Sequence, residues 1–578
     1  MRATRAVGIA EGTDGCADPH GAGGDQLLRA GSARAPAASR LPRVVAAVTV
    51  AAFLLSQAPT VRAAPGATTS GATEVAAPST DDGPAEAAQW QPADQEDYSG
   101  HHLRTLLTMG GALALWSVLY WLMMDRNVAD WDNPDPLERF DGTAWRLDNN
   151  SLPVNFIAHP LMGGGIYSIA RANHHHPATS FGYAFLTSFL WEFVLEFKEK
   201  VSVNDVLVTP GTAVPIGEFF YKLGLYLDTA ADPSVGMHIA RWSLGTGVAF
   251  DRAVDGRPPP HVVERDDLGL ARTIWHSFEA RTGVDLVSST KTPATLRPQV
   301  GFLGKLVTIP GYLREGSVST PFYLAEVSDF DIAVEGSEHG PGIAMSSDTL
   351  LAGYHEQQLG AEAERLHGQA VTFGASMAFR YLQSKANDYA EFRAARDKPQ
   401  PSWDHHVPKT AEQLSAFHMP GPALDWHGFA GGVSLSVSAR AHPDFAGIGA
   451  PAFYDWAAAY PHLKGKHILH RQGYFYGWGG SCDLRADLRL GPVRLAGSVF
   501  HGRYWSQEGL DRHVERIDVD VPATAHVSLA KASAGVQPPA WPVAIRAELG
   551  VRRWYSHVAG FERQDTSISR GVSVALQF

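Results

Sequence analysis

One feature of this 578-residue chain constrains its fold more than any other: apolar residues alternate with small or polar ones in its C-terminal half. The alternation is clearest over residues 371–381, 433–441 and 543–552. A strand places successive side chains on opposite faces, whereas a helix cannot collect alternate residues on one side. One face of each strand is therefore aliphatic and aromatic. The other face carries small residues and a few charges, among them Arg380, Arg440, Arg546 and Glu548.

The last alternating stretch ends at Phe578. Val572, Val574, Leu576 and Phe578 face one way, and small or polar residues face the other. This arrangement resembles the signal that outer-membrane barrels present to the barrel assembly machinery. A soluble β-sandwich also alternates, but its outer face is polar and its turns are closer together. We therefore predict a mostly β fold, a transmembrane antiparallel β-barrel of about 12 strands over residues 229–578.

The lengths of the strands and connections agree with a barrel. Strands of about 9–11 residues cross a membrane when they are tilted, and the alternating stretches have this length. Residues 490–493 form a predicted tight turn of the short periplasmic side. Residues 383–425 and 442–470 are rich in Pro, His, Asp and Gly, and we interpret them as longer external loops.

The N-terminal residues indicate export. An apolar run at 44–55 follows two arginines, and Val-Arg-Ala at 61–63 forms a small-x-small cleavage signal. We predict a signal peptide with a long leading region over residues 1–63 and a disordered linker over 64–96. Of the two cysteines, the first lies in this leader, so the exported chain forms no internal disulfide. The predicted location is the outer membrane of a Gram-negative cell.

The composition restricts the partners. The net charge is −12 and no Lys/Arg-rich block is present, which argues against nucleic acid. The 15 Trp residues fit a molecule with aromatic rings at a membrane interface. The expected partners are outer-membrane lipid and the barrel assembly machinery. The sequence leaves the oligomeric state open.

Residues 103–124 form an apolar segment that is nearly long enough to span a membrane. One interpretation is an anchor in the inner membrane, which would leave the β domain in the periplasm. The other is a helix buried against, or inside, a larger fold, and the Thr, Gly and Ser residues of the segment favour this second interpretation.

Residues 97–228 have the pattern of a small α-helical module. We expect helices over 163–173, 180–201 and 214–227, with a break at Pro210. Polar residues are unusually frequent among its aromatic residues. The candidate catalytic residues are His159, Glu192, Glu196 and Glu218, and the candidate polar network comprises Asn155, Tyr167, Arg171, Asn173 and Asp205.

Two of these candidates, Glu192 and Glu196, are four residues apart and would share one face of a helix. Beside aromatic residues they would raise each other's pKa, unless Arg171 or Lys198 pairs with one of them. Such a group suits acid–base chemistry or, together with His159, a metal ion. The alternative is a structural network of paired carboxylates that holds the helices together.

Three adjacent histidines occupy residues 174–176. Successive side chains cannot all face one ion, so we interpret this segment as a solvated loop with adventitious metal binding. The chain has no zinc-hydrolase, serine-hydrolase or phosphate-loop motif. The sequence therefore assigns no metal and no cofactor.

Three runs of the module resemble a known family: NFIAHPLMGGGIYSIARAN (155–173), SFLWEFVLEF (188–197) and SVNDVLVTPGTAVPIGEFFY (202–221). Their His-Pro-x-x-Gly, Tyr-x-x-x-Ala-Arg, Trp-Glu and Gly-Glu elements together are similar to an uncharacterised bacterial family, domain of unknown function 3943. The resemblance implies an exported protein with a helical segment attached to a barrel-like C-terminal region. It implies no reaction.

Two functions fit these features. The first is a non-enzymatic outer-membrane protein with the helical module packed in or under the barrel, where it meets the charges of the lumen. Its role is structural, or it lets a small solute pass. The second is an outer-membrane enzyme that acts on lipid or on an envelope polymer through His159, Glu192, Glu196 and Glu218.

Overall fold

The computed structural model describes most of residues 100–577. The predicted signal peptide and linker, and Phe578, lie outside the described residues. Also outside them are residues 124–132, 149, 231–232, 257–259, 261, 263, 267–268, 291–292, 338–340, 363–364, 385–411, 461–467, 470–472, 508–520 and 539–540.

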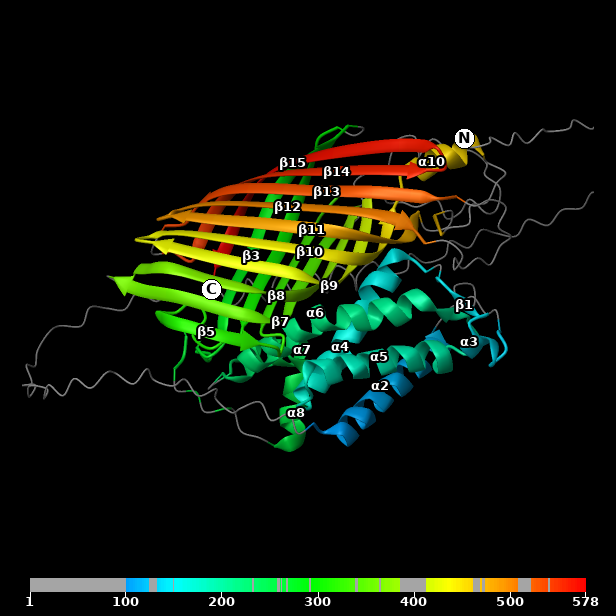
Figure 1. Cartoon of the computed structure of the whole chain (residues 1–578), viewed down its shortest axis with the longest axis horizontal. Coiled ribbons are helices and arrows are strands. Elements are labelled where there is room, and N and C mark those ends of the chain that lie inside the picture. The colour runs from blue at the N-terminus through cyan, green and yellow to red at the C-terminus, as the bar shows by residue number, and fades with distance from the viewer. Residues whose placement is uncertain are drawn as a thin grey trace, which may run out of the picture. The chain divides into compact units, whose positions relative to one another are not determined.

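Thirteen strands form one antiparallel sheet that closes on itself (Figure 1). The ring is completed by the pairing of β3 with β15 and of β7 with β8. The strands are β3 Trp275–Ser289, β4 Thr295–Val307, β5 Gly316–Phe322, β6 Val327–Glu335, β7 Gly342–Glu362, β8 Arg365–Ser384, β9 Glu412–Ala430, β10 Val433–Gly449, β11 Tyr474–Leu490, β12 Val493–Ser506, β13 Ala523–Val536, β14 Val543–Val558 and β15 Phe561–Gln577.

β5 and β6 share one position in the ring. Residues 353–359 of β7 pair with β5, and residues 342–350 of the same strand pair with β6. Both use the edge of β7 that β8 leaves free. Because two of the thirteen strands share one position, the ring has twelve strand positions. The structure thus confirms the predicted antiparallel barrel of about 12 strands, with the even number typical of bacterial membrane barrels.

The alternation along the strands separates an outer face from an inner face. Val284, Phe373 and Ile545 belong to the apolar set and are exposed on the outside. Arg380 of β8 pairs with Asp483 of β11, three positions further around the ring, at 2.7 Å. A pair between such distant strands crosses the interior. The charged set therefore lines the lumen, as predicted.

The connections differ between the two ends of the barrel. At the end where β15 finishes, two-residue turns join β9 to β10 and β11 to β12. The other end carries the longer connections 385–411, 450–473 and 507–522. Two of these loops are shorter than predicted, because β9 already begins at Glu412 and β10 continues to Gly449. A shift of register between Arg440 and Asp444 lets these polar, Pro-containing segments stay in the sheet.

Helices make up the described part of the chain before the barrel. They are α2 His102–Met123, α3 Glu138–Asp141, α4 His159–Ala172, α5 Pro177–Leu190, α6 Val203–Asp228, α7 Val235–Leu244 and α8 Thr246–Asp255, with the π-helical turns η1 Val154–Ala158 and η2 Trp191–Leu195. A short parallel pair, β1 Trp145–Arg146 with β2 Val201–Ser202, lies among them. One further helix, α10 Ala452–Ala459, follows β10.

The barrel begins later than predicted. Its first strand starts at Trp275, and α7 and α8 occupy residues 235–255, which the prediction assigned to the barrel. Ser234 starts α7, because its hydroxyl accepts a hydrogen bond from the N–H of Met237 at 3.2 Å. The helical module therefore extends beyond residue 228.

α6 passes through the predicted break. Pro210 and Pro215 both lie inside the helix, and most of its residues are buried. A proline in a helix costs about 3 kcal/mol locally. Packing against α4 and the barrel outweighs this local cost, because most helical stability in proteins comes from tertiary contacts.

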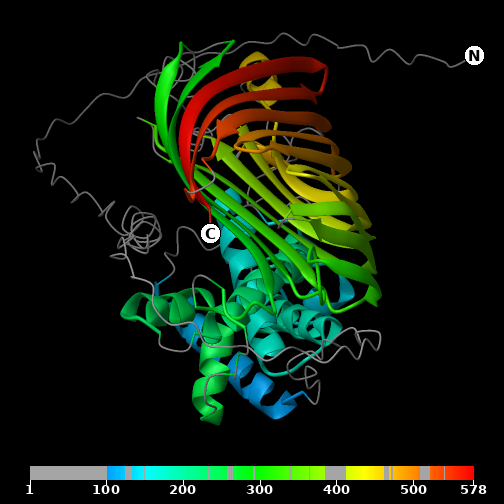
Figure 2. The same ribbon diagram turned by 90° about the vertical axis from the view of Figure 1, so that its left-hand side faces the viewer.

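The helical module packs against the outer face of the barrel wall (Figure 2). The hydroxyls of Ser347 and Thr349 on β7 donate to the carbonyl oxygen of Pro215, at 2.7 and 3.5 Å. Between them in the strand, Asp348 points to the lumen, where it pairs with Arg440. α6 therefore lies on the opposite side of the wall from the lumen charges.

This placement corrects the prediction of a module in or under the barrel. Arg380, Arg440 and Arg546 pair with acidic residues of the barrel, and Glu548 pairs with Lys531. The outward side of β6 offers Phe330 instead, on which Phe219 of α6 stacks with ring centroids 5.1 Å apart. The apolar helix is complementary to the apolar outer face and not to the charged interior.

α2 leaves most of its apolar side chains exposed. Leu103 is 72% exposed, Leu107 68% and Leu122 78%. The expectation of a helix buried inside a larger fold is therefore wrong for most of its surface. Among the described residues, one helix segment, His102–Leu122, is long and apolar enough to cross a membrane, with a mean hydropathy of 1.5.

Candidate functional site

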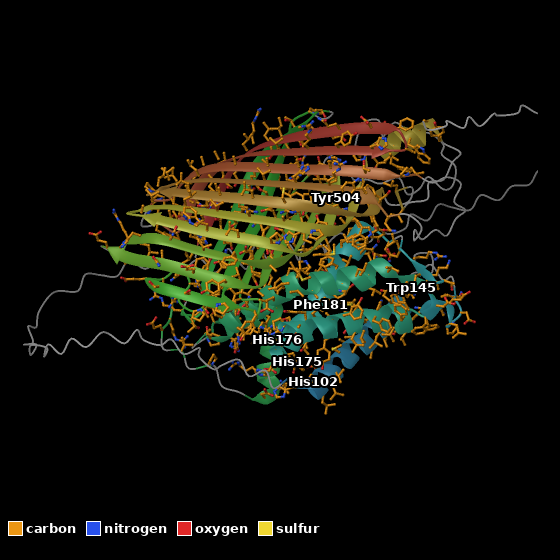
Figure 3. The ribbon with its side chains drawn as sticks, viewed as in Figure 1. His102, Trp145, His175, His176, Phe181 and Tyr504 are labelled. Carbon is orange, nitrogen blue, oxygen red and sulfur yellow. The ribbon has the colours of Figure 1, made fainter. Side chains whose placement is uncertain are left out.

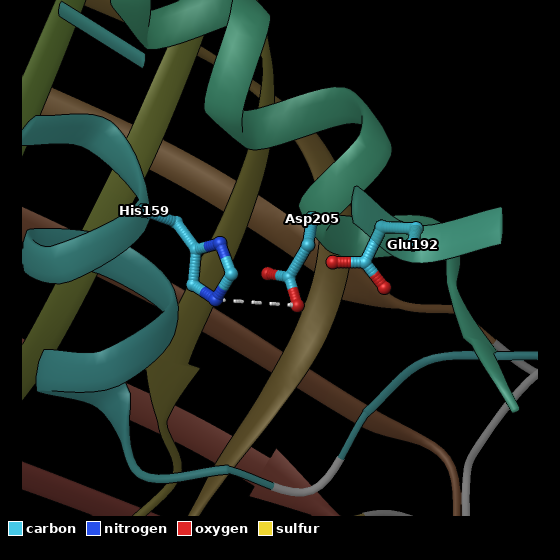
Figure 4. Close-up of side chains that lie close together, drawn as sticks. All are labelled: His159, Glu192 and Asp205. Carbon is cyan, nitrogen blue, oxygen red and sulfur yellow. Dashed lines mark ion pairs between the residues drawn. The ribbon is translucent and has the colours of Figure 1, made fainter. Parts of the chain in front are cut away.

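Three helix ends bring His159, Glu192 and Asp205 together (Figure 4). His159 is the first residue of α4, Glu192 lies in η2, and Asp205 lies in the first turn of α6. One ligand atom of each residue lies within 4.8 Å of the other two. Nε2 of His159 is 3.7 Å from Oδ2 of Asp205, which is too long for a hydrogen bond.

The two carboxyl groups are buried, and the imidazole reaches the surface. Glu192 is 1% exposed and Asp205 is 2% exposed. The side chain of His159 is 13% exposed. The group is therefore a small buried polar centre with one side open at the histidine.

The π-helical turns position two of the three residues. η1 ends immediately before His159, and Glu192 is the second residue of η2. The predicted helix over 180–201 therefore ends at Leu195, and Glu192 and Glu196 do not share an α-helical face. Glu196 instead accepts a hydrogen bond from Nε1 of Trp191 at 2.8 Å. π-turns within helices are frequent at functional sites.

Asp148 is the acceptor at the centre of the surrounding hydrogen bonds. Its Oδ1 accepts from Nδ2 of Asn155 at 2.5 Å and from the hydroxyl of Tyr476 at 3.0 Å. Nδ2 of Asn204 lies 3.4 Å from the same oxygen and 2.8 Å from Oδ1 of Asp205. Since Tyr476 lies on β11, this network joins the site to the outer wall of the barrel.

Burial sets the protonation of the centre. It raises the pKa of Glu192 well above the usual range, and the nearby Glu196 and Asp148 raise it further. Burial and Asp148 act in the same direction on the pKa of Asp205. Burial lowers the pKa of His159, so the imidazole is neutral at neutral pH. Without a cation, the two carboxyls favour their protonated forms.

Glycines allow α4 and α6 to approach closely. A Cβ atom at Gly163 would lie 2.2 Å from the carbonyl oxygen of Thr209, and one at Gly217 would lie 2.7 Å from the carbonyl oxygen of Gly164. The hydroxyl of Thr209 is 3.4 Å from Nδ1 of His159. The close crossing therefore sets the separation between His159 and the first turns of α6.

Glu218 belongs to a different network. Its carboxylate accepts hydrogen bonds from Nε of Arg171 at 2.9 Å and from the hydroxyl of Tyr167 at 2.8 Å, and Nζ of Lys222 lies 3.7 Å away. All four side chains are buried. Two cations balance this carboxylate, so the structure gives Glu218 a structural environment and does not bring it to His159.

The segment 174–176 is less solvated than predicted, because α2 lies against it and its His102 contacts His175 (Figure 3). His175 is 2% exposed, and its Nε2 lies 2.9 Å from the hydroxyl of Thr105 on α2. Burial, together with the neighbouring His102, lowers the pKa of His175 to about 4. The prediction of a solvated loop is therefore wrong at His175, because α2 covers it. Asn173 also faces α2, where it accepts a hydrogen bond from Arg104.

Ion pairs cross the lumen at several levels. They join Arg494 and Arg546 to Glu279, Lys305 to Asp425, Arg440 to Asp348, Arg380 to Asp483, and Arg552 to Glu335. A cavity of about 30 Å³ lies among the central pairs. This volume holds a water molecule or two. Paired charged side chains thus occupy the lumen at these levels.

A buried group in the lumen had no signal in the sequence. Nδ1 of His418 lies 2.7 Å from Oδ1 of Asp444 and 3.1 Å from the hydroxyl of Ser481. The hydroxyl of Tyr504 donates to the other oxygen of Asp444 at 3.1 Å (Figure 3). Both contacts of His418 use the same ring nitrogen, so the ring cannot pass a proton from the serine to the aspartate as a catalytic triad requires.

The fold defines the class of protein: a closed antiparallel barrel with an apolar outer face and a polar interior, as in transmembrane β-barrels. Residues 144–245 match the family model described as Domain of unknown function (DUF3943). The match confirms the predicted resemblance and covers the helical module from β1 to α7.

Solved structures that match part of this chain include three outer-membrane proteins, each with a low TM-score. OmpT of Vibrio cholerae is 6% identical, with 55% of this chain and 100% of that chain covered and a TM-score of 0.21. An outer-membrane channel from Pseudomonas putida F1 is 8% identical, with 53% and 94% covered and a TM-score of 0.23. The NanC porin is 8% identical, with 51% and 98% covered and a TM-score of 0.20. A comparison with curated proteins gave no match.

Proposed function

We propose that this protein is an outer-membrane barrel that acts as a scaffold for the helical module and does not conduct solutes. The ion pairs across the lumen are the observation that supports this proposal. A solute would have to break buried pairs such as Arg440 with Asp348 and Lys305 with Asp425. Each broken pair would leave an uncompensated charge, at a cost of about 3–5 kcal/mol.

The outer surface supports insertion in a membrane. Large apolar residues of β3, β12, β14 and β15 are exposed on the outer face, among them Val284, Leu495, Ile545 and Val574. The exposed face of α2 is a second apolar surface, on a module that is hydrogen-bonded to the barrel wall. Lipid acyl chains are the partner that fits both surfaces.

The export route follows from this proposal. A signal peptide over residues 1–63 would carry the chain to the periplasm, and the barrel assembly machinery would insert the barrel by its last strand. Val572 and Val574 of that strand are exposed on the outer face, whereas Ser573 between them is buried. This alternation suits a strand that faces lipid on one side.

The first experiment locates the barrel and tests the lumen. Full-length protein is expressed in a Gram-negative host, the membranes are separated by density, and the outer-membrane fraction is run on a gel with and without boiling. We expect faster migration without boiling, as for a closed barrel. In planar lipid bilayers we expect no steady conductance from the wild-type protein.

The double variant Arg380→Ala with Arg440→Ala is the matched positive control for conductance, because it removes two of the central cross-lumen pairs. Conductance in the variant alone supports a lumen closed by ion pairs. Steady conductance by the wild-type protein, or recovery of the protein in the inner membrane, contradicts the proposal.

A second function has one observation in its favour: His159, Glu192 and Asp205 form a buried polar centre beside the outer wall of the barrel. Such a centre suits an enzyme that acts on envelope lipid. Glu192→Gln keeps the shape of the side chain, and Glu138→Gln, at an exposed carboxylate of α3, is the control outside the site. If lipid extracts of cells with the first variant differ from the wild type by mass spectrometry, and those with the second do not, this function holds. Identical lipid profiles in all three strains exclude it.

A further inference from the structure

We infer that His159, Glu192 and Asp205 bind one divalent transition-metal ion. This inference goes beyond the scaffold role and does not depend on it. Its basis is that three side chains from three separate helix ends converge on one point, in a set of one imidazole and two carboxylates.

The distances fit an ion between the side chains. Metal ions of this class lie about 2.0–2.2 Å from nitrogen and oxygen ligands, so two ligands of one ion are separated by no more than about 4.4 Å. Nε2 of His159 and Oδ2 of Asp205 are 3.7 Å apart. The widest separation in the group is within 4.8 Å, which a small rotation of Glu192 would close.

One carboxylate oxygen of Glu192 has no hydrogen-bond donor among the described residues. Oε2 of Glu192 accepts from the N–H of Ser202 at 3.2 Å, whereas Oε1 accepts no hydrogen bond from the described residues. The carboxylate points toward Asp205 (Figure 4). A carboxylate that is 1% exposed needs a cation or a hydrogen-bond donor for each oxygen. An ion between Glu192, Asp205 and His159 provides the missing partner.

The remaining polar atoms hold the three ligands in place. Nδ2 of Asn204 donates to Oδ1 of Asp205 at 2.8 Å, which leaves Oδ2 toward His159. The hydroxyl of Thr209 lies 3.4 Å from Nδ1 of His159, so Nε2 is the nitrogen directed at the carboxylates. Partners of this kind around a metal orient the ligands and raise their affinity.

The charges around the site also favour a cation. Glu196 and Asp148 are acidic neighbours of Glu192, and Asp148 also lies beside Asp205. A divalent ion would balance the carboxylates when they are ionised. The mixed oxygen and nitrogen set suits Zn²⁺ or Mn²⁺, and the exposed edge of His159 leaves room for a water ligand.

The test uses the full-length protein, purified from the outer membrane in detergent and stripped with a chelator. It is mixed with Zn²⁺ or Mn²⁺ and desalted, and bound metal is measured by inductively coupled plasma mass spectrometry. We expect one equivalent in the wild type. The variants Glu192→Gln, Asp205→Asn and His159→Gln should each bind at least roughly tenfold more weakly, as loss of a ligand predicts.

Two controls separate this site from adventitious binding. Glu138→Gln changes an exposed carboxylate of the same helical module, and His174→Gln changes a partly exposed histidine. Both should keep one equivalent. Migration without boiling reports folding of each variant. A wild type without stoichiometric metal, or site variants that keep it while folded, overturns the inference, and neither result bears on the conductance experiment.

Discussion

At Glu192 the surroundings of a single carboxyl govern how the fold responds to pH. Its pKa is raised by burial and by Glu196 and Asp148. A carboxyl whose pKa is higher in the folded chain than in the unfolded chain stabilises the fold. This stabilisation is complete below the unfolded pKa, near 4.3 for Glu. Above it, about 1.4 kcal/mol is lost for each unit of pH until the pH exceeds the pKa of the folded chain.

We therefore expect the free energy of unfolding of the metal-free protein to fall as pH rises from about 5 to about 8. Glu192→Gln should flatten this dependence, because an amide stays neutral throughout. Urea unfolding at both pH values, with Glu138→Gln at an exposed carboxylate as the control, measures the effect. Equal slopes in the wild type and Glu192→Gln would contradict the assignment.

In the lumen, a substitution of Arg440 measures how much a buried ion pair contributes to the free energy of unfolding. Its guanidinium lies 2.7 Å from Asp348 and 2.8 Å from Asp425. Arg440→Ala leaves two buried acids without this cation, so we expect a loss of about 3–5 kcal/mol. Arg553 lies on the exposed outer side of β14, and Arg553→Ala should cost no more than about 1 kcal/mol. Similar losses of unfolding free energy in both variants would show that the ion pairs of the lumen contribute little to stability.

At the scale of elements, the crossing of α4 and α6 depends on the small size of Gly163. A Cβ atom there would lie 2.2 Å from the carbonyl oxygen of Thr209, whereas one at Gly165 meets nothing within 4 Å. We expect Gly163→Ala to cost about 1–3 kcal/mol through overpacking. Gly165→Ala should be neutral or stabilise by up to about 1 kcal/mol, since alanine favours helices.

Denaturant unfolding of the two variants in parallel measures this difference. The displacement of α4 also moves His159 away from Asp205, so metal binding should weaken in Gly163→Ala and not in Gly165→Ala. Equal stability and equal metal binding in the two variants would mean that α4 and α6 are further apart at Gly163 than in the structure.

At the scale of the whole molecule, the placement of α2 in lipid is open to a labelling test. In a Cys482→Ser background, Leu107→Cys places a thiol on the exposed face of α2, where Leu107 is 68% exposed. We expect a membrane-impermeant maleimide to label it in detergent but not in outer-membrane vesicles. Leu137→Cys, at a residue 76% exposed near α3, should be labelled in both. Rapid labelling at Leu107→Cys in vesicles would place α2 in water.

The barrel and part of the site follow from the sequence because their signals are local. Alternation along a strand depends only on neighbouring residues, so the inward set with Arg380 and Arg546 was predictable before any pairing was known. The frequency of polar residues among aromatic ones likewise singled out His159 and Glu192 as candidate site residues and Asp205 as part of a polar network. The ends of the elements were less predictable: packing carries α6 through Pro210, and η2 replaces the last turns of the expected helix.

The sequence by itself determined a membrane-type antiparallel barrel of about 12 strands and a helical module that precedes it in the chain. The tertiary structure alone decided that this module lies outside the wall, that Asp205 joins His159 and Glu192, and that Glu218 pairs with Arg171 instead. The reason is physical. The alternation of a strand is set by residues two apart, whereas the contacts between the module and the wall join residues up to 328 apart in the chain. Only the packing of whole elements chooses among such partners.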